Sequence, residues 1–286
     1  MHYSTNISNM NYETLYNEIR RKGSFLCVGL DTDINKIPEH LRSEEYPLWS
    51  FNKSIIDATA PFCVAYKPNT AFYEAHGAKG WKELEMTVEY IKKEYPEILV
   101  ICDAKRGDIG NTAGLYARAF YESMNADAVT LAPYMGSDSI APFLNYDGKW
   151  SIVLAMTSNP SAEEFETLEL CEGTPLYEKI IRQTMGYVDK NYGPSKERLM
   201  FVVGATRAQM LAKIREICPD NFLLVPGVGA QGGSLEEVAK YGLNSHCGLL
   251  VNSSRGIIYA SKGEDFAQAA AAEAEKLATQ MKTILG

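Results

Sequence analysis

The chain contains 286 residues, 46% of them hydrophobic, and carries a net charge of −8 from 28 basic and 36 acidic side chains. This length and composition suffice for a large buried core, and α/β barrels of this size commonly form one domain. The acidic balance argues against a nucleic-acid partner, because binding a phosphate backbone needs a concentrated basic face. A small anionic ligand needs only a local positive pocket. We also expect no signal peptide and no membrane span, since the first residues resemble no leader and no apolar run approaches about 18 residues.

Six cysteines are present, and none forms a Cys-x-x-Cys pair. Four of them lie in apolar runs typical of strands, which suits small buried hydrophobic residues. We interpret all six as small buried, unpaired thiols in a reducing compartment and expect a cytoplasmic protein. They are Cys27, Cys63, Cys102, Cys171, Cys218 and Cys247.

Eight short, nearly continuous apolar runs alternate with segments of helical periodicity. Such runs are typical of strands buried on both faces, and eight strand–helix units predict a parallel (β/α)8 TIM barrel, with a doubly wound open sheet as the alternative. No boundary is visible in the composition, so we expect a single domain over residues 1–286, in which 1–22 form a helical extension covering the barrel floor. The strand-like runs are 25–31, 63–69, 98–105, 128–134, 151–158, 199–206, 222–229 and 246–254, and the helix-like segments are 48–60, 80–96, 110–124, 174–191, 206–217, 233–241 and 263–284.

Charged residues stand where the first three strands are expected to end. Asp31 follows the first strand, Lys67 lies near the end of the second, and Asp103 and Lys105 end the third. The carboxyl ends of barrel strands carry the chemistry of this fold, and residues two apart share one face of a strand. We therefore expect Asp103 and Lys105 to point together into the barrel mouth. The alternative is that Asp103 and Lys105 form a purely structural ion pair. Lys67 on the neighbouring strand argues against it, because burying several ionised groups without a functional use would be costly in desolvation.

Asp108 lies beyond the third strand, just before a segment of helical periodicity. A carboxylate is favoured near the start of a helix by the helix dipole, so an ordinary helix-opening Asp is one interpretation. If the helix begins there, Thr112 lies one turn later on the same face. Spacing alone leaves a structural and a catalytic role open.

The segment 159–175 is long, acidic and weakly periodic. Connections in α/β units usually span about 2–6 residues, and a longer one is often a lid or a binding loop. A solvated insertion is equally consistent with its composition.

Glycine-rich segments follow the last two expected strands, PGVGAQGG at 226–233 and NSSRGI at 252–257. The backbone amides of such turns bind phosphate, and Arg255 can add a charge-assisted hydrogen bond. Barrel enzymes commonly hold phosphate after strands 7 and 8. The two segments together predict a phosphate site on that side of the mouth.

These motifs resemble the orotidine 5′-phosphate decarboxylase family, in particular its longer bacterial subfamily. DAKRGDIGNTA at 103–113 matches the family signature D-x-K-x-x-D-I-x-x-T, and GLDTD, AYKPNTAFYE, MTSNPS, PGVGAQGG and NSSRG occur in family order. The likeness extends from about residue 25 to residue 258. The pattern D-x-K-x-x-D by itself is shared with sugar-phosphate decarboxylases of related barrels.

The resemblance implies decarboxylation of orotidine 5′-monophosphate to uridine 5′-monophosphate in pyrimidine biosynthesis, with no cofactor and no metal. It also implies a homodimer whose active sites are shared between the subunits. Lys105 would deliver the proton to C6, with Asp103 against the substrate carboxylate and Lys67 in the same charged array. Asp31 and Lys67 would bind the ribose hydroxyls, and Ser158 would recognise the pyrimidine. Gln231 would bridge the ring side and the phosphate, and Arg255 would bind the phosphate. Asp108, Ile109 and Thr112 would enter the neighbouring subunit's site.

The reaction suits a lysine placed between carboxylates. Loss of CO2 leaves an anion at C6, which a preorganised ammonium group stabilises and then protonates. Asp103 and Asp108 would keep a buried Lys105 protonated against desolvation. The nearest alternative is a metal-dependent decarboxylase or aldolase acting on a sugar phosphate, against which MTSNPS and GAQGG argue. A barrel that binds a phosphometabolite without catalysis is the third possibility.

Overall fold

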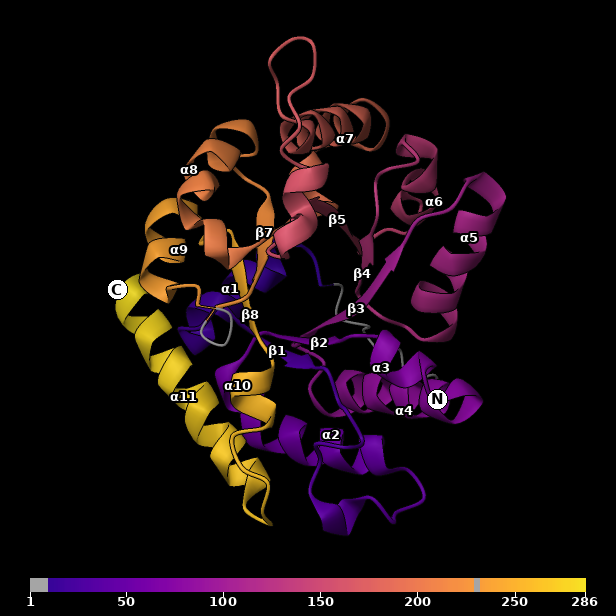
Figure 1. Ribbon diagram of the computed structural model, residues 1–286, viewed down its shortest axis with the longest axis vertical. Coiled ribbons are helices and arrows are strands. Elements are labelled where there is room, and N and C mark those ends of the chain that lie inside the picture. The colour runs from indigo at the N-terminus through magenta and orange to yellow at the C-terminus, as the bar shows by residue number, and fades with distance from the viewer. Residues whose placement is uncertain (1–9, 229–231) are drawn as a thin grey trace, which may run out of the picture.

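The computed structural model describes residues 10–228 and 232–286, and its eight strands form a closed parallel barrel (Figure 1). Strand β1 pairs with β2 on one side and with β8 on the other, which closes the sheet. The predicted (β/α)8 barrel is confirmed, and the open sheet is excluded. The strands are β1 (Leu26–Leu30), β2 (Ala65–Pro68), β3 (Leu99–Arg106), β4 (Ala128–Leu131), β5 (Trp150–Met156), β6 (Leu199–Val203), β7 (Phe222–Pro226) and β8 (Leu249–Ser253).

Helices surround the barrel, and each helical segment predicted from periodicity is present within a few residues of its expected bounds. The connection between β4 and β5 holds a 3-10 turn over Ser137–Ser139 and the four-residue α6 but no long helix, because its Pro- and Gly-containing sequence lacks helical spacing. No helix in the described part of the chain is long and apolar enough to cross a bilayer. The helices are α1 (Tyr12–Lys22), α2 (Pro47–Thr59), α3 (Ala71–Glu74), α4 (Gly77–Glu94), α5 (Gly110–Arg118), α6 (Ala141–Leu144), α7 (Leu176–Tyr192), α8 (Ala208–Ile217), α9 (Leu235–Gly242), α10 (Arg255–Ile258) and α11 (Phe266–Leu285).

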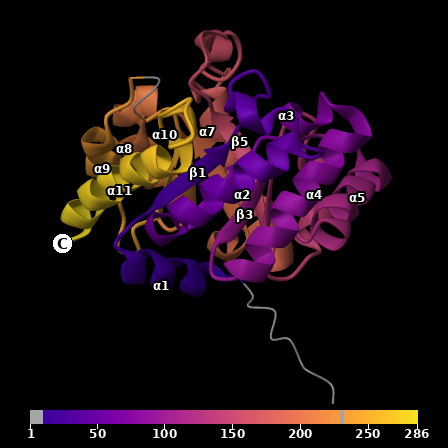
Figure 2. The same cartoon turned by 90° about the horizontal axis from the view of Figure 1, so that it is seen from below.

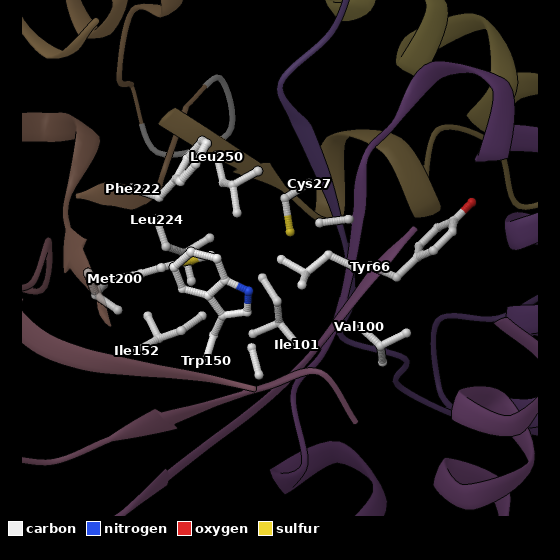
Figure 3. Close-up of a cluster of buried hydrophobic side chains, with 14 of the residues drawn as sticks. Cys27, Tyr66, Val100, Ile101, Trp150, Ile152, Met200, Phe222, Leu224 and Leu250 are labelled. Atoms are coloured by element: carbon white, nitrogen blue, oxygen red, sulfur yellow. The ribbon is translucent and has the colours of Figure 1, made fainter. Parts of the chain in front are cut away.

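Large apolar side chains fill the barrel interior. Figure 3 shows Trp150, Met200 and Phe222 gathered in one cluster, whereas the ring of Tyr66 points away from it. The Tyr66 hydroxyl donates to the carbonyl of Ile56 in α2, 2.9 Å away. Burying an apolar side chain of this size contributes about 1.5–3 kcal/mol. Apolar packing therefore stabilises the barrel interior. The charged residues at the mouth are not part of this packing.

Helix α1 lies across the amino-terminal ends of the strands (Figure 2). The ring of Tyr12 lies 5.2 Å from that of Phe222, the first residue of β7. Trp150, the first residue of β5, donates its indole N–H to the carbonyl of Met10 at 2.6 Å. The opposite end of the barrel, where the charged residues lie, is left open to ligands. Residues 1–9 of the expected extension lie outside the described residues.

The cysteines are all unpaired, and five of them are buried as expected. Cys171 is exposed, so its predicted burial is wrong. It lies in the long segment 159–175, outside the packing of strands and helices. The buried thiols are those of Cys27, Cys63, Cys102, Cys218 and Cys247.

Candidate active site

Strand β3 departs from regular pairing where its charged residues begin. Its pairing with β4 is regular up to Cys102 and resumes at Arg106. The segment Asp103–Lys105 therefore lies opposite Thr130 alone, as a β-bulge, and Lys105 has a left-handed φ of 47°. Bulges re-aim side chains and are frequent beside active sites. Asp103 and Lys105 thus meet through a local irregularity and not through simple alternation along the strand.

Asp103 binds both lysines of the mouth. Its Oδ2 atom lies 2.8 Å from Lys67 Nζ, and its Oδ1 atom lies 2.7 Å from Lys105 Nζ. The Thr130 hydroxyl donates to the same Oδ1 at 2.9 Å. The side chains of Lys67 and Asp103 are 6% and 11% exposed, but that of Lys105 is 48% exposed. Lys105 is therefore not the buried lysine that was expected, and it is the charge of this cluster that a ligand can approach.

The charges of the cluster stabilise one another. Burial of Asp103 favours the neutral acid, but Lys67 and Lys105 outweigh it and hold the pKa of this carboxyl well below its ordinary value. Burial likewise disfavours the charged form of Lys67, yet the carboxylates of Asp103 and Asp31 hold its pKa above the usual value. Both groups are therefore ionised at neutral pH.

A polar cavity of about 150 Å³ lies on one side of this cluster. The Oδ1 atom of Asp31 is buried and has no hydrogen-bond partner among the described residues, so it can bind a ligand hydroxyl. Arg255, the first residue of α10, lines the same cavity together with Gly227 and Ser254. A guanidinium beside backbone amides suits an anionic group such as phosphate.

A second cavity, of about 280 Å³, lies on the other side of the cluster. Leu154, Val202 and Leu224 line it with aliphatic groups, and Ser158 also lines it. A Cβ atom on Gly204 would lie 2.7 Å from the Cβ of Ser158, so the end of β6 can approach Ser158 only as glycine. An aliphatic wall with a polar edge suits a flat heterocyclic ring.

The segment 159–175 extends beside α7 (Figure 1) and is tied to the strand ends near the second cavity. The Glu166 carboxylate accepts the N–H of Thr157 at 2.7 Å and its hydroxyl at 2.8 Å. Glu163 forms an ion pair with Arg207 at 2.7 Å. Two of the acidic side chains, Glu163 and Glu166, thus anchor the segment to the barrel. This anchoring favours a binding loop over a solvated insertion.

Asp108, Ile109 and Thr112 lie outside both cavities, around the start of α5. The Asp108 side chain accepts the Ile109 N–H at 2.7 Å and forms no ion pair with any residue in the described ranges. Ile109 is the N-cap residue, so Asp108 does not cap the helix. Ile109 and Thr112 are exposed. The structure therefore does not bring these three residues into the chain's own site.

Residues 24–271 match the model of the orotidine 5′-phosphate decarboxylase / HUMPS family. The chain belongs to this family. An orotidine 5′-phosphate decarboxylase of Phocaeicola vulgatus is 57% identical over 276 residues, covering 96% of this chain and 99% of the relative. One of Porphyromonas gingivalis is 56% identical over 276 residues, covering 96% and 98%. Among solved structures, the Leishmania donovani OMP decarboxylase is similar with a TM-score of 0.80 at 35% identity, covering 96% of this chain and 99% of that one.

Two residues at the barrel mouth, Asn69 and Thr130, were not predicted from the sequence to belong to the site. Asn69 lines the polar cavity and forms an isolated bridge with Asp103. Thr130 contacts Asp103 directly, and its only signal was a polar residue within the apolar run AVTL. Gln231, predicted to bridge the ring side and the phosphate, lies outside the described residues.

The low pKa of Asp103 predicts a pH-dependent contribution to stability. The folded protein keeps this carboxyl ionised in acid, where the unfolded chain, with an ordinary pKa of about 3.9, binds a proton. This stabilisation is fully present above the unfolded pKa and is lost progressively as pH falls from there through the lower pKa of the folded protein, so Tm should drop on acidification. Asp103→Asn should reduce the drop by about 3 °C. Thermal unfolding from pH 7 to pH 3 measures the drop.

Asp147→Asn is the control for this experiment, because it removes a carboxylate that is 87% exposed. It should leave the drop in Tm as it is in the wild type. An equal drop in Asp103→Asn and in the wild type would contradict the stabilising role of the cluster.

Proposed function

We propose that this chain decarboxylates orotidine 5′-monophosphate to uridine 5′-monophosphate without a cofactor, with Lys105 delivering the proton to C6. The chain is a carboxy-lyase of pyrimidine biosynthesis, since the orotidine 5′-phosphate decarboxylase of Phocaeicola vulgatus is 57% identical to it over 96% of its length. The observation that carries the residue assignment is Asp103 between Lys67 and Lys105, at the junction of a polar and an apolar cavity. The unpaired thiols support a cytoplasmic location.

In this reaction the bond between C6 and the carboxylate carbon breaks, and its electron pair stays on C6 as CO2 leaves. The ring offers no obvious electron sink, so positive charge beside C6 has to stabilise the anion. The half-exposed ammonium of Lys105 is held at the edge of the apolar cavity by Asp103. It stabilises the anion, transfers one proton to C6, and regains a proton from solvent after product release.

Asp103 orients both lysines, a role supported by its contacts of 2.7 and 2.8 Å. It also lies beside the position proposed for the substrate carboxylate, where two negative charges repel until CO2 departs. Orientation is the larger contribution in this proposal, because the carboxylate is already compensated by two ammonium groups.

The two cavities divide the nucleotide between them. Asp31, with its buried unpaired oxygen, and Lys67 bind the ribose hydroxyls. Arg255 binds the phosphate with Gln231 and the amides that follow β7, and Ser158 recognises the pyrimidine in the apolar cavity. Because the phosphate is remote from C6, its binding energy can be used for loop closure and desolvation.

A homodimer with shared sites is supported by exposed apolar side chains on α5 and on the segment after β4, which we call the α5 surface. Exposed apolar patches of this kind mark interaction sites. Asp108 and Thr112 adjoin the α5 surface, so its burial in a dimer would direct them into the partner's site. The side chains of the surface are Ile109 (56% exposed), Leu115 (52%), Tyr116 (36%), Tyr134 (91%) and Met135 (48%).

The alternative, a metal-dependent enzyme acting on a sugar phosphate, is less well supported. The aliphatic wall of Leu154, Val202 and Leu224 suits a pyrimidine ring better than a polyhydroxylated sugar. The relatives from Phocaeicola vulgatus and Porphyromonas gingivalis, 57% and 56% identical to this chain, are orotidine 5′-phosphate decarboxylases.

Replacing the proton donor tests the mechanism. Lys105→Ala should lower kcat for orotidine 5′-monophosphate by roughly 1,000-fold or more, because it removes both the stabilising charge and the proton. Far-UV circular dichroism and size-exclusion chromatography should show a folded dimer. Lys276→Ala, which changes a 67% exposed lysine on α11, should leave kcat unchanged. Near-normal turnover by Lys105→Ala would contradict the assignment.

Mixing inactive subunits tests the shared site. Lys105→Ala and Asp108→Ala proteins should each be inactive alone, but a mixed dimer contains one site without either change. After subunit exchange, turnover should recover to roughly one quarter of the wild-type value, since about half of the dimers are mixed and each has one intact site. Absence of recovery, with exchange confirmed by mass spectrometry of the native dimers, would show that Asp108 does not act across the interface.

A further inference from the structure

We infer that Thr130 is a positioning residue that sets Lys105 and Asp103 in the arrangement needed for proton transfer. The inference rests on the proposed function of Lys105 and extends it to a residue on the neighbouring strand. It is carried by two hydrogen bonds of one hydroxyl group. Thr130 Oγ1 accepts the backbone N–H of Lys105 at 2.9 Å and donates to Asp103 Oδ1 at 2.9 Å.

The bulge explains why this hydroxyl is needed. Regular pairing of β3 with β4 stops at Cys102 and resumes at Arg106, so the intervening backbone lacks its regular ladder. The hydroxyl takes the place of a β4 carbonyl as acceptor for the Lys105 N–H. Thr130 is 1% exposed in an otherwise apolar strand, AVTL. Burying a hydroxyl group lowers the stability of the fold unless its hydrogen bonds are made inside the protein.

The same hydroxyl closes a ring of hydrogen bonds. Asp103 Oδ1 accepts both the Thr130 hydroxyl and the Lys105 ammonium, at 2.9 and 2.7 Å, and the Lys105 backbone returns to Thr130. The Thr130 hydroxyl on β4 thereby fixes the Lys105 backbone directly and the Lys105 ammonium through Asp103. Its left-handed backbone, with φ of 47°, is sparsely populated for a residue with a Cβ atom and persists only where the surroundings fix it.

Loss of the hydroxyl should affect turnover more than binding. Lys67 contacts the other carboxylate oxygen, Oδ2, and the polar cavity lies on the far side of the cluster. Ribose and phosphate contacts therefore remain when Thr130 Oγ1 is removed. A displacement of the ammonium by about 1 Å from its working position can lower the rate about 100-fold.

Thr130→Val removes both hydrogen bonds and keeps the shape of the side chain, and Thr130→Ser keeps the hydroxyl. We expect Thr130→Val to lower kcat by about 10- to 100-fold with KM and product-nucleotide affinity within about threefold of wild type. Thr130→Ser should retain kcat within about threefold. Thr59→Val is the matched control, because Thr59 is equally buried and its hydroxyl also has two partners, the Ile55 carbonyl in α2 and the Tyr66 hydroxyl, outside the barrel interior. It should leave kcat unchanged.

Wild-type kcat in Thr130→Val, a loss confined to KM, or equal impairment of the Ser and Val variants would overturn the inference. If Thr130→Val does not fold, Thr130→Ala replaces it, with the same expectations. A wild-type protein that fails to decarboxylate orotidine 5′-monophosphate would overturn the proposed function instead. The two failures are therefore distinguishable in one experiment.

Discussion

One buried carboxylate that binds two ammonium groups is the constraint on which the mouth of this barrel depends. Burial alone would drive Asp103 and Lys67 toward their neutral forms, and only their mutual attraction, with Lys105, keeps them charged. Lys67 is enclosed, whereas Lys105 remains half exposed. The cluster therefore divides into a fixed charge that holds the site together and a second charge that a substrate can reach.

The barrel supplies the conditions for this cluster. Neighbouring strands bring Lys67 from β2, Asp103 from β3 and Thr130 from β4 to one rim. Packed apolar side chains fill the barrel interior (Figure 3). Because the neighbouring strands β2 and β4 are fully buried, they can hold one strained residue, Lys105, at the barrel mouth.

The barrel and the charges at its mouth were predictable, because buried parallel strands are continuous apolar runs that charged residues visibly interrupt. The bulge at Lys105 was not, since it depends on how β3 pairs with β4, which sequence spacing does not encode. The hydrogen bond of Thr130 with Asp103 could not be predicted for the same reason. Short α6 and exposed Cys171 lie in irregular connections, where packing and not periodicity decides. The assignment of Asp108 to a partner's site came only from the family resemblance and stays a prediction.

We propose that this charge cluster decarboxylates a pyrimidine nucleotide without a metal. The most direct test follows the ultraviolet absorbance of orotidine 5′-monophosphate with the purified wild-type protein, in the presence and absence of EDTA, and identifies the product by mass spectrometry. We expect full conversion to uridine 5′-monophosphate with one CO2 released per nucleotide, at the same rate with and without the chelator. No conversion, or conversion that EDTA stops and a divalent metal restores, would contradict it.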